Sequence, residues 1–443
     1  MRASHFGTDG VRGIANEYLT PELAMQLARA TAACAMHSGG CVIIGRDTRT
    51  SGPMLEAALA SAFSSAGIDV HLAGIIPTPA ISFLIKDERA DLGVVISASH
   101  NPPSDNGIKL FDSRGRKLSA ETEASIEKRF EDFLPPAKKI GRIDVLDAAA
   151  TRYAAFLTGV IDVDRVDFSG MKMVLDCAYG ATSKIAPHVF RHLGATVVSL
   201  HATCDGDRIN EACGATHLDA LQAATLEHSA DLGIAFDGDG DRVLLIARDG
   251  SVIDGDRMMG IAAEFMMAQG TLQPPAIVST VLSNSGFEHW LKQRGIELKR
   301  TDVGDRYVSH GMEAHGIRLG GEPSGHIIFS EHSPTGDGIL TAVKLLEIAH
   351  LQDRDLSKMA EGIPLFPQCA RNIRCKHARA LAESPAVQAA VRAAELRLES
   401  SGRIVVRPSG TQPLLRIMVE VEDEMLCNQI ADDLAQALEA LAC

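Results

Sequence analysis

Residues 171–200 read MKMVLDCAYGATSKIAPHVFRHLGATVVSL. An apolar strand is followed here by a turn rich in Gly, Ser and Thr, then a helix and a second apolar strand, which is the order of a β-α-β unit. The same order recurs in residues 41–74 and 276–301. Such units build mostly parallel sheets with helices on their faces, so the sequence predicts three α/β domains of similar topology.

The end of the chain has a different pattern. Residues 403–422 are typical of two short strands around a loop, and residues 428–442 of a closing helix with leucines and alanines on one face. We therefore expect a smaller C-terminal α+β domain. The predicted fold is α/β, with three α/β domains of similar topology plus this α+β domain around a central cleft.

A length of 443 residues is sufficient for three or four domains of ordinary size. Stretches rich in glycine and charge, or in proline, lie at residues 248–256 and 364–367 and indicate junctions. The predicted domains are residues 1–150, 151–254, 255–367 and 368–443. Near the start, Thr20 and Pro21 predict the N-cap and first position of a helix.

Three aspartates alternate with glycines in the run Asp-Gly-Asp-Gly-Asp-Arg at residues 237–242. Alternate residues of an extended segment face the same way, so Asp237, Asp239 and Asp241 can direct their oxygens at one hard cation. An EF-hand loop needs Gly and Glu where this chain has Arg242 and Arg248, which excludes that class. A solvated acidic turn is the plainer alternative.

An apolar run from Leu92 ends in small polar residues, which predicts that Ser99 lies at the end of a strand. Near a metal and an arginine, its hydroxyl could carry a phosphoryl group; it could equally be an ordinary loop serine. Ser99 and His100 are consecutive and would point apart on an extended segment, so a Ser-His hydrolase is disfavoured. Lys109 could shuttle a proton if its pKa is lowered, or be a surface lysine.

Two further loops carry polar groups. Arg407 and Arg416 flank hydroxyls and a glycine at residues 408–413, which suits a phosphate dianion or a plain turn between strands. Residues 320–326, Gly-Gly-Glu-Pro-Ser-Gly-His, place Glu322, Ser324 and His326 in a loop where they could bind sugar hydroxyls or simply form a turn.

These features resemble a known family. In order, the chain contains Phe-Gly-Thr-Asp-Gly-Val-Arg-Gly at 6–13, Ser-Ala-Ser-His-Asn-Pro at 97–102, Asp-Gly-Asp-Gly-Asp-Arg at 237–242, Gly-Glu-Pro-Ser-Gly-His at 321–326 and Arg-Pro-Ser-Gly-Thr at 407–411. Together they resemble the α-D-phosphohexomutases over the whole chain. Residues 213–217 and 303–308 are most similar to the branch of that family that acts on glucosamine phosphates.

The resemblance implies that Ser99 is a phosphoserine whose oxygen, with Asp237, Asp239 and Asp241, holds one Mg²⁺ per chain. Around the transferring phosphoryl group it places Arg12, His100, Lys109 and Arg242. At the sugar ring it places Glu322 and Ser324, with His326 close by. The phosphate that is not reacting would be held by Arg407, Ser409, Gly410, Thr411 and Arg416. In chain order, the four domains would bear the phosphoserine, bind the metal, bind the sugar and bind the second phosphate.

The implied activity is that of an intramolecular phosphotransferase of the isomerase class. It would interconvert glucosamine 6-phosphate and glucosamine 1-phosphate, with a hexosamine 1,6-bisphosphate as intermediate and activator, and supply amino-sugar nucleotides for the cell wall. The alternatives are a phosphoglucomutase or phosphomannomutase, a metal-dependent phosphatase, and a non-catalytic sugar-phosphate binding protein. Two positions depart from the family pattern: Pro323, where the glucosamine branch usually has Gln, and Gln412, where Glu is common.

Composition agrees with such an enzyme. A formal net charge of −14 disfavours nucleic acid or an anionic membrane as partner, so local cations must attract an anionic sugar phosphate. Nine scattered cysteines without a Cys-x-x-Cys pair argue against a disulfide framework or a structural zinc site. The sequence contains neither a membrane-length apolar run nor a signal pattern, so we expect a cytoplasmic protein. A monomer and a homodimer are both compatible with the sequence.

Overall fold

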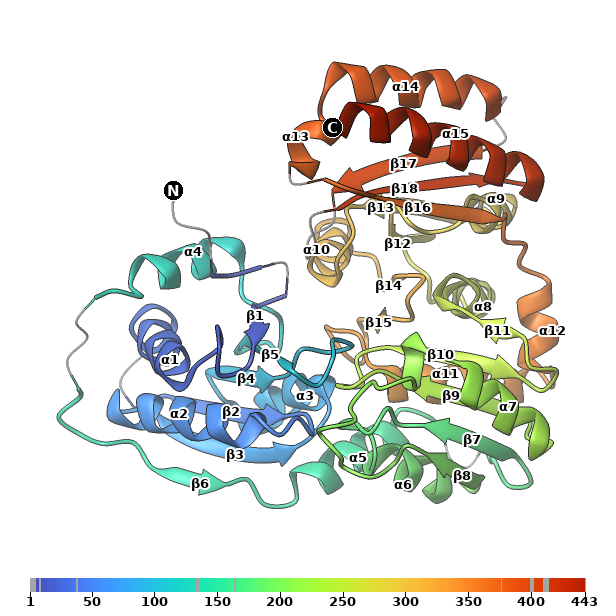
Figure 1. Ribbon diagram of the computed structural model, residues 1–443. Coiled ribbons are helices and arrows are strands. Elements are labelled where there is room, and N and C mark those ends of the chain that lie inside the picture. The colour runs from blue at the N-terminus through green and yellow to red at the C-terminus, as the bar shows by residue number, and fades with distance from the viewer. Residues whose placement is uncertain are drawn as a thin grey trace.

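The computed structural model describes residues 5–7, 9–36, 39–132, 136–162, 165–375, 377–398, 402–408 and 414–442. Four sheets follow one another along the chain, each with its own helices. In Figure 1 the first sheet lies at the left, the second at the lower right, the third above the second and the C-terminal one at the top. The predicted architecture, three α/β domains and a C-terminal α+β domain, is confirmed.

The first sheet has the strand order β1-β5-β4-β2-β3-β6. Its strands are β1 (Val11–Ile14), β2 (Cys41–Arg46), β3 (Asp69–Ile75), β4 (Leu92–Ile96), β5 (Asp105–Asp112) and β6 (Ile143–Val145). Its helices are α1 (Pro21–Ala35), α2 (Gly52–Ser65), α3 (Thr78–Glu88) and α4 (Ala120–Lys128). Thr20 caps α1 as predicted, because its side chain accepts a hydrogen bond from the Leu23 amide.

The second sheet has the order β11-β10-β9-β7-β8. Its strands are β7 (Lys172–Asp176), β8 (Thr196–Leu200), β9 (Leu232–Phe236), β10 (Val243–Ala247) and β11 (Val252–Ile253). The helices before and within this part are α5 (Ala149–Gly159), α6 (Ile185–His192) and α7 (Asp219–Glu227), with a 3-10 turn at Gly214–Thr216.

The third sheet has the order β13-β12-β14-β15. Its strands are β12 (Ala276–Thr280), β13 (Glu297–Thr301), β14 (Leu319–Gly321) and β15 (Ile327–Phe329). Its helices are α8 (Gly255–Ala268), α9 (Ser285–Gln293), α10 (Asp305–His315), α11 (Gly338–Leu351) and α12 (Leu356–Glu361).

All three predicted β-α-β units are present. They are β2-α2-β3, β7-α6-β8 and β12-α9-β13, and in each the two strands pair in parallel. Strands such as β4 and β9 are buried along their whole length, as expected for a sheet that helices cover on both faces. Their carboxyl ends are therefore where polar loops can gather.

The C-terminal sheet is antiparallel, with the order β16-β18-β17. Its elements are β16 (Gln368–Arg374), α13 (Ala378–Ala382), α14 (Pro385–Glu395), a 3-10 turn (Leu396–Leu398), β17 (Gly402–Pro408), β18 (Leu414–Val421) and α15 (Glu424–Ala442). The predicted strand pair is confirmed. The closing helix begins at Glu424 rather than at residue 428, because the Asp423 carboxylate accepts hydrogen bonds from the amides of Met425 and Leu426.

The apolar core is divided unequally. One buried cluster extends through the first three domains and includes Ile81 of α3, Tyr153 of α5, Phe236 of β9 and Phe287 of α9. The C-terminal domain has a separate cluster that includes Ile417. None of the helices in the described part of the chain combines the length and apolar composition that a membrane span requires.

Candidate active site

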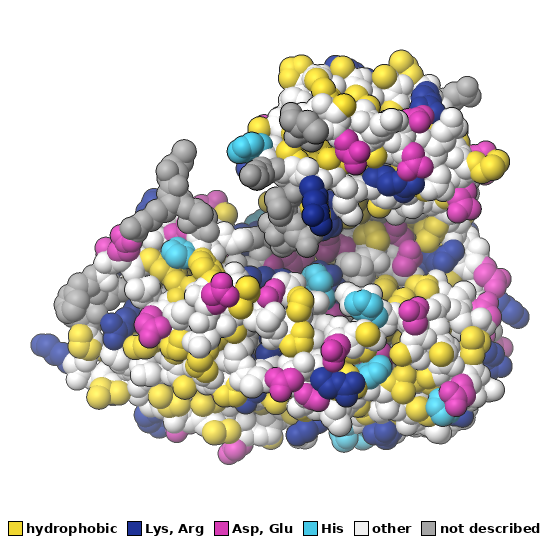
Figure 2. Space-filling view, in the orientation of Figure 1, with side chains coloured by type: hydrophobic (Ala, Val, Ile, Leu, Met, Phe, Trp, Pro, Cys, Tyr) yellow, Lys and Arg dark blue, Asp and Glu magenta, His cyan; other side chains and the backbone are white. Residues whose placement is uncertain are grey.

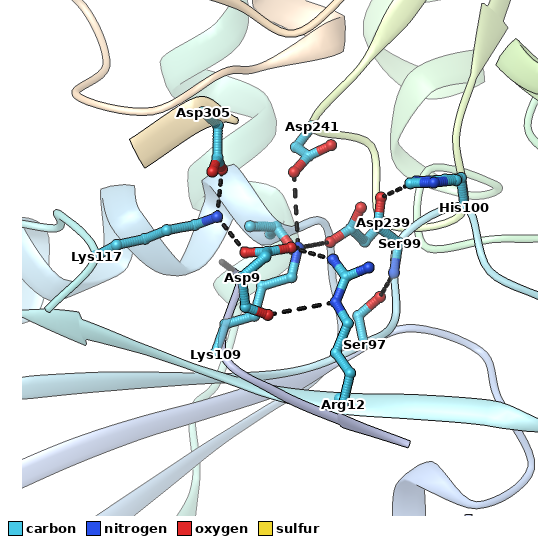
Figure 3. A network of polar contacts seen from close by, with 12 residues as sticks. Asp9, Arg12, Ser97, Ser99, His100, Lys109, Lys117, Asp239, Asp241 and Asp305 are labelled. Atoms are coloured by element: carbon cyan, nitrogen blue, oxygen red, sulfur yellow. Dashed lines mark hydrogen bonds and ion pairs between the residues drawn. The ribbon is translucent and has the colours of Figure 1, made fainter. Parts of the chain in front are cut away.

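Loops at the ends of three strands meet between the domains. Residues 97–102 follow β4, residues 237–242 follow β9, and residues 322–326 follow β14. Figure 2 shows the surface hollowed between the first domain at the left and the C-terminal domain at the upper right. Figure 3 shows the polar network at this meeting point, where dashed lines join Lys109 to Asp239 and Asp241, and Ser99 to His100.

Ser99 lies at the centre of this network. Its side chain is buried, and its Oγ donates a hydrogen bond to Asp237 Oδ2 at 2.7 Å. Its backbone has a left-handed φ of 52°, which is uncommon for a residue other than glycine. The expectation that Ser99 and His100 point apart is therefore wrong: the left-handed turn brings Ser99 Oγ within 3.2 Å of His100 Nδ1.

The three aspartates converge, although not on an extended segment as expected. Residues 238–241 form a turn in which the Gly240 amide bonds to the Asp237 carbonyl and Gly240 has a φ of 73°. One ligand atom from each of Asp237, Asp239 and Asp241 lies within 4.8 Å of the others. The three carboxylates are thus brought together by a turn with glycine at its left-handed position, and not by the expected alternation of side chains along a strand.

The residues present fit a bound cation. Asp239 Oδ1 and Asp241 Oδ1 are buried and have no hydrogen-bond partner among the described residues. Burial, together with repulsion from Asp241 and Asp239, raises the pKa of Asp237 well above its ordinary value. A cation among these oxygens would satisfy the orphaned atoms and remove the repulsion, and a set of carboxylate oxygens is suited to a hard ion.

Lys109 is a fixed cation. Its Nζ lies 2.8 Å from Asp239 Oδ2, 3.2 Å from Asp9 Oδ2 and 3.7 Å from Asp241 Oδ2. Burial alone would lower the pKa of Lys109, but these three carboxylates outweigh it and raise the pKa instead. The lowered pKa that a proton-shuttling Lys109 would need is therefore not found.

Arg12, His100 and Arg242 form the rest of the wall around Ser99. Arg12, on β1, pairs with the carboxylate of Asp9. Burial, with the nearby cations Arg242 and Arg12, lowers the pKa of His100 to about 4, so its imidazole is neutral at neutral pH. Arg242 Nε is buried without a hydrogen-bond partner among the described residues. Two guanidinium groups and a neutral imidazole beside a hydroxyl suit a phosphate group.

The three predicted residues of the third-domain loop, Glu322, Ser324 and His326, differ in burial and in hydrogen-bond partners. Glu322 is buried, and its Oε1 accepts a hydrogen bond from the Gly304 amide at 3.2 Å, whereas Ser324 is half-buried. His326 Nε2 accepts a hydrogen bond from the Gly336 amide at 3.1 Å, and its Nδ1 lies 3.7 Å from Asp241 Oδ2. His326 is thus held between backbone and a candidate metal ligand.

In the C-terminal domain, Arg407 and Arg416 face each other directly in the β17–β18 register. Like charges opposite one another are unfavourable. Burial and repulsion by Arg416 lower the pKa of Arg407, and Arg416 Nε is buried without a partner among the described residues. This pair is suited to bind an anion. The predicted Ser409, Gly410 and Thr411, and the departure at Gln412, lie outside the described residues.

Asp9, Lys117 and Asp305 also belong to the network but are not among the site residues predicted from the sequence. Lys117 bonds to both Asp9 and Asp305 and so joins the first and third domains. Asp9 lies in the motif at residues 6–13 and Asp305 in the stretch at residues 303–308, so the sequence contained a signal for both. Nothing in the sequence around Lys117 indicated a role. Beside this bridge a cavity of about 240 Å³ opens between the two domains, lined in part by Lys117, Arg306 and His310.

The family models that match this chain describe successive parts of one kind of protein. They are "Phosphoglucomutase/phosphomannomutase, alpha/beta/alpha domain I" over residues 3–134, domain II over 151–250, domain III over 254–366 and the C-terminal domain over 371–437.

Relatives and solved structures agree with these models. The chain is 46% identical over 443 residues to a phosphoglucosamine mutase of Moorella thermoacetica, covering 98% of this chain and 99% of the relative. It is 45% identical over 438 residues to one of Rhodococcus opacus, covering 97% and 98%.

A phosphoglucomutase/phosphomannomutase family protein of Burkholderia thailandensis superposes with a TM-score of 0.83 at 27% identity, over 98% of this chain and 96% of that one. The fold also matches an Aspergillus fumigatus N-acetylphosphoglucosamine mutase in complex with GlcNAc-6P and magnesium, with a TM-score of 0.70 at 17% identity over 99% and 96%.

Proposed function

The chain belongs to the phosphoglucomutase/phosphomannomutase family, and we propose that it interconverts glucosamine 6-phosphate and glucosamine 1-phosphate. The resemblance to the α-D-phosphohexomutases and the expectation of a mutase are confirmed by this membership. The glucosamine substrate follows from the names of the relatives, which are phosphoglucosamine mutases at 45–46% identity over nearly the full chain.

The observation that carries the proposal is the contact between Ser99 and the aspartate cluster. A serine hydroxyl 2.7 Å from Asp237, with Lys109 and Arg242 nearby, has the surroundings of a phosphoryl carrier. A phosphorylated Ser99 would extend its oxygens toward those cations. Mg²⁺ held by Asp237, Asp239, Asp241 and the phosphoserine would supply charge neutralisation of the transferring phosphoryl oxygens.

The chain's own residues have separate roles in the proposed reaction. The sugar hydroxyl attacks the phosphorus, the bond from phosphorus to Ser99 Oγ breaks, and the product is a hexosamine 1,6-bisphosphate. The sugar hydroxyl loses a proton and the departing Ser99 Oγ gains one, so no net proton is released. His100, whose imidazole is neutral and whose Nδ1 lies 3.2 Å from Ser99 Oγ, is suited to pass this proton between the two oxygens. Lys109 keeps its proton and pairs with oxygen charge instead.

The second half of the reaction requires the bisphosphate to turn over. Its other phosphate is then returned to Ser99, so one phosphate reacts while the other is held. We assign the holding site to Arg407, Arg416 and the loop between them. We assign the sugar contacts to Glu322 and Ser324, and we assign to His326 the additional task of orienting Asp241.

We further infer where the enzyme acts, what its product supplies and what each domain contributes. The activity belongs in the cytoplasm, where the product would enter the synthesis of cell-wall amino-sugar nucleotides, and the bisphosphate would act as activator. The domains proposed at residues 1–150, 151–254, 255–367 and 368–443 would contribute phosphoserine, metal site, sugar loop and phosphate site in that order, in a monomer or homodimer.

Sugar preference is the direct test. In coupled assays with a trace of bisphosphate, kcat/KM for glucosamine phosphate should exceed that for glucose or mannose phosphate about tenfold or more, because a site that pairs with an amine rejects the analogue lacking it. Equal or reversed values indicate a phosphoglucomutase or phosphomannomutase. In that case Pro323→Gln tests whether the proline is responsible, since it fixes the backbone beside Glu322.

The same assay separates the other two alternatives. Inorganic phosphate released at the rate of substrate loss would indicate a phosphatase. Sugar-phosphate binding without turnover, in protein that carries phosphate on Ser99, would indicate a binding protein.

A further inference from the structure

The main chain of Ser99 is held in an unusual conformation by groups far away in the sequence. A left-handed φ at a non-glycine residue costs free energy and persists only where its surroundings enforce it. The Ser99 amide donates to Ser97 Oγ at 2.9 Å, and Ser97 Oγ in turn donates to Asp47. The Ser99 carbonyl accepts two hydrogen bonds, one from each of two domains.

The first of these comes from Arg49. Its side chain has no exposed surface, and its Nε pairs with Asp47 at 2.9 Å. Among the described residues, its terminal nitrogens bond only to backbone carbonyls, which are those of Ser99 at 3.1 Å, Asn101 at 2.8 Å, Asp105 at 2.9 Å and Pro102. A single rigid guanidinium fork therefore ties together the whole loop between β4 and β5.

The second comes from Asn210, in the metal-bearing domain. Asn210 Nδ2 donates to the carbonyls of Ser99 at 2.9 Å and Asn101 at 3.1 Å. Close packing leaves no room for slippage here: a Cβ added at Gly238 would lie 2.7 Å from the Ser99 carbonyl oxygen and 2.8 Å from Asn210 Nδ2. The side-chain amide of Asn210 thus fixes the position of the Ser99 loop, residues 97–102, relative to the aspartate loop, residues 237–242.

We propose that Arg49 and Asn210 are positioning residues for phosphoryl transfer, which fix the Ser99 main chain so that Oγ is directed at the aspartate cluster and the sugar hydroxyl. This inference rests on the proposed phosphoserine role of Ser99. The hydrogen bonds of both residues to the Ser99 loop go to main-chain carbonyls and not to Ser99 Oγ. Their action is geometric, because displacement of a reacting atom by about 1 Å can cost on the order of 100-fold in rate.

Three variants test the proposal. Arg49→Lys keeps the charge beside Asp47 but loses the fork, and Arg49→Ala leaves a space that added guanidinium ion can fill. Asn210→Gly removes the amide while tolerating the left-handed φ of 62° at this position. The matched control is Thr50→Val, because Thr50 Oγ1 also joins the two domains, through Asp207 at 2.6 Å, but within the described part of the chain it has no hydrogen bond to residues 97–102.

In the full-length Mg²⁺-loaded protein, Arg49→Lys and Asn210→Gly should lower kcat about 10- to 100-fold with KM changed less than about twofold. Thr50→Val should match wild type. Guanidinium at non-denaturing concentration should restore part of the kcat of Arg49→Ala. If Arg49→Ala does not fold, Arg49→Lys and Asn210→Gly decide the question.

The inference is overturned if folded Arg49→Lys and Asn210→Gly keep wild-type kcat, if only KM changes, or if the loss of kcat follows a loss of thermal stability. Failure of the proposed function gives a different result. In that case Ser99→Ala remains active, or the phosphate of wild-type protein lies on another peptide, whatever the Arg49 and Asn210 variants do.

Discussion

At the scale of single residues, the site is a set of buried charges that are balanced only together. Lys109 forms ion pairs with Asp9, Asp239 and Asp241. Lys117 forms ion pairs with Asp9 and Asp305, so the two lysines share Asp9. Removing one partner of such a group leaves the others buried and unpaired, which is costly. Substitutions that keep shape and remove only one function are therefore the informative ones.

Ser99→Ala should abolish isomerisation and leave the fold intact, because it deletes the hydroxyl and little packing volume. Mass spectrometry of wild-type protein should place a single phosphate on the peptide that contains Ser99, and the variant should carry none. A phosphate on another peptide, or activity in the variant, contradicts the assignment.

Asp239→Asn should weaken Mg²⁺ binding and phosphoryl transfer together, because it removes one charge from the cation site. Calorimetric titration with Mg²⁺ measures the first and the coupled assay the second. Asp249→Asn is the control, since Asp249 also precedes a glycine in the same domain but is exposed. Wild-type activity that survives exhaustive chelation would show that the aspartates do not serve a metal.

At the scale of elements, helix starts place the loops around the site. Asp254 caps α8 by accepting a hydrogen bond from the Arg257 amide at 3.0 Å. Asp256 is buried in the first turn of α8. Its carboxylate accepts a hydrogen bond from the Asn284 amide at 2.7 Å, which links α8 to the start of α9. Burial and repulsion by Asp254 raise the pKa of Asp256 to about 7.

The raised pKa of Asp256 predicts a pH dependence. Between about pH 4 and about pH 7 the folded protein holds a proton on Asp256 that the unfolded chain has released, so this contribution to stability is lost as pH rises through that window. Relative to Asp256→Asn, the thermal unfolding temperature of wild type should therefore fall from pH 5 to pH 8.

At the scale of the whole molecule, the C-terminal domain has its own core and is joined to the third domain by polar contacts. Arg403 Nη1 donates to the Val281 carbonyl at 2.6 Å, and the Ser285 amide donates to Glu420 at 2.8 Å. Interfaces of this kind permit movement of one domain against another. Such movement would allow the bisphosphate of the proposed reaction to turn over between the two proposed phosphate sites.

Arg416→Ala should raise KM for the monophosphate about tenfold, the effect of losing one charge-assisted hydrogen bond, and let bisphosphate escape into solution. Phosphorylation of Ser99 by added bisphosphate should still occur, because Arg416 belongs to another domain. Arg397→Ala is the control, since Arg397 pairs with Asp433 on the surface of the same domain. An unchanged KM would assign this loop a structural role only.

Residue order alone is sufficient to predict the architecture and most of the candidate residues. The three β-α-β units and the cap at Thr20 depend on local periodicity and short-range hydrogen bonds, which residue order encodes directly. The clusters of polar residues at strand ends were visible for the same reason. The start of α15 was misplaced because one side chain, Asp423, decides it.

The interactions among those residues, in contrast, arise from contacts that exist only in the folded chain. The backbone of Ser99 adopts a left-handed φ because Arg49 and Asn210 hold its carbonyl by hydrogen bonds, and these residues lie 50 and 111 positions away in the sequence. Lys109 keeps its proton because folding surrounds it with three carboxylates, two of them from another domain. Periodicity reports which face of an element is buried, whereas a pKa or a strained φ depends on contacts between segments that are distant in the chain.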